Sequence, residues 1–124
     1  MSADRFSSIG VLKQHLAKDY NRVNMCIFAG GVISVKIDII QDKILILANH
    51  KRIAALEYLS KENSIVSDLA DNYLVKSFKK EFNKILVNDY GFDILSLFKD
   101  YDARSELSLT TVYLKDSIEY YIKA

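Results

Sequence analysis

The chain has 124 residues, of which 50% are hydrophobic and 27% charged, a balance typical of a folded domain with a buried core. We expect a single α+β domain over residues 1–124. The formal net charge of +1 argues against a strongly basic nucleic-acid-binding protein and against an acidic tail. The one cysteine, Cys26, permits no internal disulfide and favours a reducing compartment, so we expect a cytoplasmic protein.

The sequence predicts neither a signal peptide nor a membrane span. Residues 1–6 carry Asp4 and Arg5 instead of an apolar segment. No apolar stretch approaches the roughly 20 residues that a membrane helix needs. Any work at a membrane would then be peripheral and would go through a partner.

The first predicted element is a helix capped by Ser7 or Ser8 and running to about Tyr20. Its apolar residues recur at helical spacing, at Ile9, Leu12, Leu16 and Tyr20. The segment 21–31 allows either more helix or an extended chain. Gly30 and Gly31 end it, because glycine tolerates backbone angles that other residues avoid.

A β-hairpin is predicted next, over residues 30–47. Val35, Ile37 and Ile39 alternate with Ser34, Lys36 and Asp38, which indicates a strand with one apolar face. After a turn at Gln41 and Asp42, the continuous apolar run 44–47 is typical of a strand buried on both faces.

Two helices should follow the hairpin. Asn49 is the expected cap of the first, which runs to about Lys61 with Ile53, Leu56 and Leu59 on its buried side. The second should run from about Ile65 to Asp89 and end at Gly91. Its expected buried residues are Leu69, Tyr73, Phe78, Phe82 and Ile85.

A second hairpin is expected in the last third. Residues 92–98 form one run, residues 100–104 a polar turn, and residues 106–113 an alternating strand with Leu107, Leu109, Thr111 and Tyr113 on one side. Asp116 should cap a short helix over 117–122. The order α-ββ-α-α-ββ-α favours an α+β fold whose two hairpins form a four-stranded antiparallel sheet with helices on one face. The other face should show Lys36, Asp38 and Ser108 to water or to a second copy of the chain.

Catalytic and metal-binding patterns are not evident. His15 and His50 lie far apart without a second ligand at helical spacing, and Cys26 fits a buried structural thiol better than a nucleophile. An enzyme would need His15, Cys26 or His50 to converge with carboxylates in space. We therefore expect no enzymatic activity, no cofactor and no metal.

Three charged features remain as candidates. His50, Lys51 and Arg52 form a basic cluster at a helix start, which fits a solvated helix end or, less well, an anion or acidic-partner site. Lys76, Lys80 and Lys84 form a basic stripe, which is usually the wet face of an amphipathic helix. The stripe lacks the interleaved aromatics of a nucleic-acid surface. Asp100 and Asp102 fit local turn bonding better than cation binding.

The order of elements and several segments resemble the MpsC-like family, which is associated with a sodium-translocating, membrane-potential-generating system. These segments are residues 28–37, 41–47, 89–91, 94–97 and 112–114, together with Asp100. Ala29 and Val32 stand where the family has glycine and proline, and the family's Leu-Thr-x-x-Glu signature is absent at 51–55. The resemblance implies an accessory or regulatory protein, without a known reaction, that assists a membrane ion or bicarbonate transport system.

Two function hypotheses follow. In the leading one, the chain is a non-enzymatic homodimer that acts through protein contacts, with a membrane transport protein as its expected partner. The residues to test are the Gly30–Gly31 loop, the cluster of His50, Lys51 and Arg52, and Asp100 and Asp102. The alternative is a small-ligand or anion sensor that uses the same basic cluster.

Overall fold

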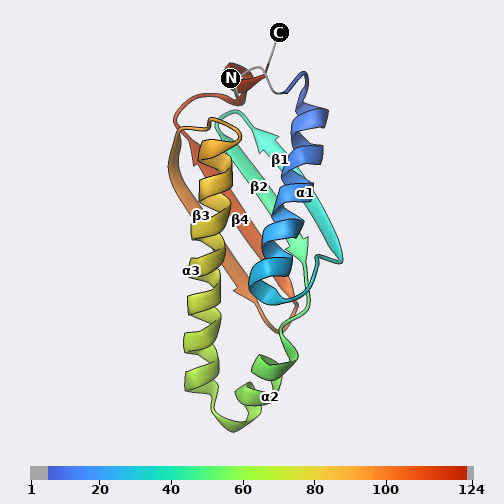
Figure 1. Cartoon of the computed structure of the whole chain (residues 1–124), viewed down its shortest axis with the longest axis vertical. Coiled ribbons are helices and arrows are strands. Elements are labelled where there is room, and N and C mark those ends of the chain that lie inside the picture. Colours follow the sequence, from blue (N-terminus) through green and yellow to red (C-terminus); the bar gives the residue numbers. More distant parts are fainter. Residues whose placement is uncertain (1–5, 123–124) are drawn as a thin grey trace.

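The computed structural model describes residues 6–122 and has two layers, a four-stranded antiparallel sheet and a helical layer on one of its faces (Figure 1). The elements follow in the order α1 (Ile9–Phe28), β1 (Ser34–Ile40), β2 (Lys43–Asn49), α2 (Ala54–Glu62), α3 (Ser64–Asn88), β3 (Ile94–Asp102), β4 (Leu107–Leu114) and the 3-10 helix η2 (Ile118–Tyr121). The strands lie side by side as β1-β2-β4-β3. The predicted α+β class, the two hairpins and the one-sided helical layer are confirmed.

Helix α1 begins where the sequence predicts and ends two turns later. The Ser8 hydroxyl accepts a hydrogen bond from the Val11 amide at 3.2 Å, which caps the first turn. Leu12, Leu16 and Tyr20 are fully buried, and the segment 21–28 continues the helix as far as Phe28. The core therefore includes the last turns of α1 as well as its predicted stripe.

The loop after α1 is held against the helix by two asparagine side chains. Asn24 Nδ2 donates to the Gly30 carbonyl at 2.8 Å, and Asn21 Oδ1 accepts from the Val32 amide at 2.8 Å. A Cβ on Gly31 would lie 3.0 Å from Asn21 Oδ1. The loop therefore approaches α1 closely at Gly31, and the predicted turn at Gly30–Gly31 packs on α1.

The predictions for α2 and α3 are partly wrong. Asn49 is the last residue of β2 and caps no helix, and α2 begins at Ala54 without a side-chain cap. Asn63 caps α3 instead, with its Oδ1 3.2 Å from the Val66 amide. Leu69 and Tyr73, expected in the core, are 64% and 70% exposed.

The reason is the side of α3 on which these residues lie: Leu69 and Tyr73 come nine residues, or two and a half turns, before Phe78 and Phe82, and therefore face the opposite side of the helix. Its N-terminal part, together with α2, projects beyond the ends of the strands, where there is no sheet to pack against (Figure 1). Farther along the same helix, Phe78, Phe82 and Leu86 lie over the sheet and are fully buried. Gly91, at φ 71°, terminates the helix in the left-handed region, as predicted. We call α2 and residues 64–77 of α3 the helical arm.

The second hairpin differs from the prediction in extent and in phase. Strand β3 continues to Asp102, so Asp100 and Asp102 are strand residues and the turn spans 103–106. In β4 the buried positions are Ser108, Thr110, Val112 and Leu114, while Leu107, Leu109 and Tyr113 face outward. The expectation that Ser108 faces water is wrong, whereas Lys36 and Asp38 are exposed as expected. Asp116 does not cap the last helix, which follows Ser117 and is a 3-10 turn.

Strand β2 is covered on one face only. Ile44, Ile46 and Ala48 are fully buried beneath the helices, but Leu47 on the opposite face is 42% exposed. The prediction that residues 44–47 are buried on both faces is therefore wrong for the single chain.

Adjacent residues of β2 give a direct test of this orientation. We expect Ile46→Ala to lower the free energy of unfolding by about 2–5 kcal/mol, because it removes methylenes from a packed core. Leu47→Ala should lower it by much less, since that side chain is already partly in water. Urea denaturation of both variants in dilute solution measures the difference. Equal losses would contradict the assigned faces.

Candidate functional site

Arg52 fixes the helical arm to the rest of the molecule. Its side chain is 7% exposed, and Nη2 lies 2.6 Å from Asp71 Oδ2 on α3 and also bonds the Ser67 hydroxyl. Nη1 lies 3.7 Å from Glu57 Oε2 on α2. Burial opposes the charge of the guanidinium, but the hydrogen bond and charge of Asp71 outweigh it and raise the pKa of Arg52. One cation thus ties both helices of the arm to the link that follows β2.

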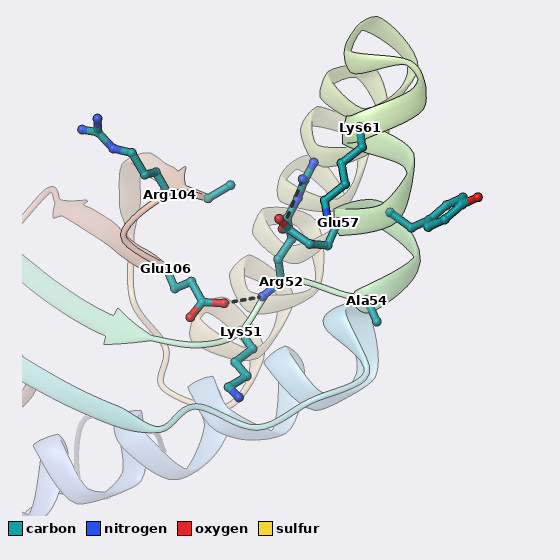
Figure 2. Close-up of a pocket in the computed structure, with 9 residues that line it drawn as sticks. Lys51, Arg52, Ala54, Glu57, Lys61, Arg104 and Glu106 are labelled. Atoms are coloured by element: carbon teal, nitrogen blue, oxygen red, sulfur yellow. Dashed lines mark hydrogen bonds and ion pairs between the residues drawn. The ribbon is translucent and has the colours of Figure 1, made fainter.

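Beside Arg52 lies an open cavity of about 690 Å³, between the link after β2, helix α2 and the β3–β4 turn (Figure 2). Its charged residues are Lys51, Arg52, Glu57, Lys61, Arg104 and Glu106. The carboxylate of Glu106 accepts a hydrogen bond from the Arg52 amide at 3.4 Å. In Figure 2 the side chains of Lys51 and Arg104 extend away from Arg52, so the cations do not converge on one point.

The structure separates the predicted basic cluster. Lys51 is exposed and Arg52 is held in ion pairs, whereas His50 is 1% exposed and points into the core. The His50 ring stacks on Tyr101 with centroids 4.6 Å apart and also contacts Phe28. Burial, together with the charge of Lys99, lowers the pKa of His50 to about 4. His50 is therefore a neutral core residue and not part of an anion site.

The other predicted site residues lie elsewhere. Gly30 and Gly31 lie in the loop after α1, and Asp100 and Asp102 lie on the sheet face that the helices leave open. Asp102 Oδ1 accepts from the Arg104 amide at 3.1 Å, which confirms local turn bonding for this carboxylate. Within residues 6–122 no group of three or more His, Cys, Asp or Glu could hold a metal ion.

The three candidate catalytic residues also lie apart. Cys26 is exposed near the end of α1, so the prediction of a buried thiol is wrong. His15 lies eleven residues earlier on the same helix, about 16 Å along its axis, with its ring against Phe6. His50 is enclosed in the core.

A buried lysine, which sequence reasoning missed, forms a polar centre between the two layers. Lys99 is 7% exposed, and its Nζ lies 2.6 Å from the Tyr20 hydroxyl and 3.3 Å from Ser108 Oγ. The same nitrogen lies 4.1 Å from the centroid of the Phe78 ring and 4.9 Å from that of Tyr20. Burial lowers the pKa of Lys99 to about 7. The signal in the sequence is a lysine at an inward position, between Leu97 and Tyr101.

The outward face of α3 carries two kinds of side chain. Ile65, Leu69 and Tyr73 follow one another at four-residue spacing on the arm and are each more than 60% exposed. The predicted basic stripe continues on the same face, because Lys76 and Lys80 are 11 residues beyond Ile65 and Leu69 and three turns of helix take 10.8 residues. We call these five residues the α3 stripe.

Comparison with protein-family models, with curated proteins and with solved structures gives no match to this chain. Among the helices of residues 6–122, none has the length and apolar character required to cross a bilayer. The MpsC-like resemblance therefore stays a prediction.

The buried lysine predicts an unusual pH dependence of stability. The pKa of Lys99 is about 7 in the folded chain and takes the ordinary lysine value of 10.5 in the unfolded chain. Between these two pH values, Lys99 is protonated in the unfolded state but not in the folded state. The free energy of unfolding should therefore rise with pH over this window, by up to about 1.4 kcal/mol per pH unit. In Lys99→Met this rise should be absent. Urea denaturation from pH 6 to 9 measures it.

The matched control for that series is Lys18→Met, which removes an exposed lysine from α1. It should keep the slope of the unmodified chain, because its side chain lies in water in both the folded and the unfolded state. Identical slopes for Lys99→Met and the unmodified chain would contradict a buried, deprotonated Lys99.

Proposed function

We propose that this chain is a non-enzymatic accessory or regulatory protein that works as a cytoplasmic homodimer and acts through protein contacts. Its partner is a membrane transport protein for ions or bicarbonate, to which it attaches peripherally. The MpsC-like resemblance is what suggests a transport system as the partner. The proposal that the chain acts through protein contacts rests on the α3 stripe.

The arm has the features of a docking element. Helix α2 has no buried residue, and Tyr58 on α2 and Ile65 on α3 are 69% and 73% exposed. Large apolar side chains gathered on one projecting hairpin are typical of an interaction surface. The ion pair between buried Arg52 and half-buried Asp71 holds the hairpin in place, so binding loses little conformational entropy.

The chemistry of the stripe defines the partner surface. The end carrying Ile65, Leu69 and Tyr73 requires an apolar groove, since burial of such side chains stabilises the complex. Lys76 and Lys80 have no ion-pair partner among residues 6–122 and require carboxylates beside that groove. A protein surface with an apolar groove and an acidic rim satisfies both.

The test is recovery of the partner with a tagged chain from separated membrane and soluble fractions. A membrane transport protein should be recovered with the unmodified chain and reduced about tenfold or more with Leu69→Asp, since burial of a leucine contributes about 1.5–3 kcal/mol. The purified pair should bind with the same difference.

Tyr120→Asp is the matched control, because Tyr120 is 69% exposed but lies on η2, away from the arm. It should recover the partner as the unmodified chain does. Failure to recover any transport protein, or equal recovery with Leu69→Asp, would refute the proposal.

Anion sensing is the second candidate, and the cavity beside Arg52 favours it. Lys51, Lys61 and Arg104 line this cavity and have no carboxylate partner among residues 6–122, so their long side chains are free to turn inward around an anion. Its volume of about 690 Å³ is in the range of small-ligand sites.

This candidate predicts thermal stabilisation. At low salt, bicarbonate, phosphate or a nucleotide at about 100 times its Kd should raise the Tm by roughly 5–10 °C, because it binds only the folded chain. The double variant Lys51→Ala/Arg104→Ala should lose this shift, while Lys13→Ala/Lys18→Ala on α1 should keep it. An unchanged Tm across the panel would exclude the site.

A further inference from the structure

The sheet face opposite the helices is open and largely apolar. Helices α1 and α3 lie on the same side of the sheet (Figure 1), and no described element covers the other side. Its exposed apolar residues come from all four strands, with Ile40 on β1 at 55% exposure. They include Leu47 at 42%, Leu107 at 41%, Leu109 at 45% and Phe98 at 59% exposure. We call this surface the open face.

The charges on the open face are arranged asymmetrically. Strand pairing places Lys36 beside Leu47, Leu47 beside Leu109, and Leu109 beside Asp100. One row across the sheet therefore reads cation, apolar, apolar, anion, with the charges on the two edge strands. Neither Lys36 nor Asp100 has an ion-pair partner among residues 6–122.

A hollow of about 270 Å³ lies at the anionic end of this row. It is lined by Leu47, Asp100, Asp102, Ser105 and Leu107–Leu109, so its only charged side chains are carboxylates. The hollow and Lys36 thus lie at opposite edges of the same face. The hollow can bind a cation, and Lys36 carries one.

We propose that two copies of this chain pack open face to open face about a twofold axis parallel to the strands, with Lys36 of each copy against Asp100 of the other. Rotation about such an axis places β1 of one copy opposite β3 of the second and keeps each row in register. Leu47 then meets Leu109 of the second copy, and Lys36 enters the acidic hollow. This interface deepens the homodimer in the proposed function and rests on it.

The charges favour this axis over one that runs across the strands. An axis across the strands would place Lys36 against Asp38 of the second copy and leave Asp100 and Asp102 facing β3 of that copy, which offers no exposed cation. The axis parallel to the strands places Lys36 of each copy in the acidic hollow of the other copy. Two antiparallel sheets packed with nearly aligned strands are a common arrangement.

The size of the face sets the concentration range of the test. Four strands about 4.8 Å apart and seven residues long cover about 450 Å² in projection. This is at the low end for a specific interface, so a dimer that dissociates at micromolar concentrations is expected. Sedimentation of the purified chain from about 1 to 500 µM covers that range.

Charge exchange provides the decisive experiment. Lys36→Asp and Asp100→Lys should each weaken the dimer about tenfold or more, because each places like charges together twice. The double variant Lys36→Asp/Asp100→Lys should restore the Kd to within about threefold of the unmodified value. The two residues are three strands apart within one chain, so restoration must come from contacts between copies.

Several results would overturn the interface. A chain that is monomeric at the highest concentration has no such dimer. Rescue by Lys36→Asp/Asp38→Lys, without rescue by the exchange with Asp100, would assign the axis across the strands. A dimer unchanged by Leu109→Asp would lie on another surface.

Two variants separate this inference from the partner proposal. Leu109→Asp should abolish the dimer, whereas Leu69→Asp on the α3 stripe should leave its Kd unchanged. Both side chains are exposed in the single chain, and far-ultraviolet circular dichroism checks that both variants fold. Loss of the dimer with Leu69→Asp would contradict the open-face interface, and retention of the dimer without partner binding would contradict only the α3 stripe.

Discussion

The hydroxyl of Tyr20 is the polar centre around which the two layers are assembled. It lies 2.6 Å from Lys99 Nζ, 3.1 Å from Ser108 Oγ and 3.2 Å from Thr110 Oγ1. A buried polar group without partners is destabilising, so these four side chains must meet if Tyr20 and Lys99 are inside. When Lys99 is protonated, its ammonium is also attracted to the aromatic faces of Tyr20 and Phe78.

This centre sets the phase of β4 and, through it, the character of the open face. Side chains alternate along a strand, so inward Ser108 and Thr110 force Leu107, Leu109 and Tyr113 outward. The same strand pairs with β2, whose Leu47 lies beside Leu109. The hydrogen bonds that buried Tyr20 and Lys99 require therefore leave a band of leucines on the surface of the single chain.

Periodicity was sufficient to predict much of the fold. The alternation in β1, the helical spacing at Leu12, Leu16 and Tyr20, and the glycine after α3 identify the elements and their order, because each pattern depends on local geometry alone. The predicted phase of β4 was wrong because apolar residues occur on both sides of this strand, with Leu107 and Leu109 on one side and Val112 and Leu114 on the other. Only the long-range bonds of Ser108 and Thr110 to Tyr20 choose between them.

The candidate site was harder to predict for the same reason. Lys51 and Arg52 were identified from a local cluster, but the roles of His50 and Lys99 depend on burial. Leu69 and Tyr73 fit the helical stripe of a core, yet they lie two and a half turns before the buried Phe78 and Phe82 and so on the opposite side of α3. Where apolar residues lie on both sides of a helix, a single sequence gives its period without saying which side packs on the sheet. The cavity beside Arg52 likewise joins segments some 50 residues apart.

The open face and the arm are related by their positions on the strands. The arm projects past the strand ends that carry Asn49, Asp102 and Leu107 (Figure 1). A twofold axis parallel to the strands keeps this end of both copies on the same side of the dimer, whereas an axis across the strands would place the arms at opposite ends. The proposed dimer therefore carries both arms at one end, with the two α3 stripes on its opposite outer sides. Two linked contacts raise the effective concentration of the second, so a partner whose two equivalent grooves reach both sides binds far more tightly than either arm alone allows. The phase of β4, by exposing the leucines that form the dimer, would thus also determine the valency of the arm.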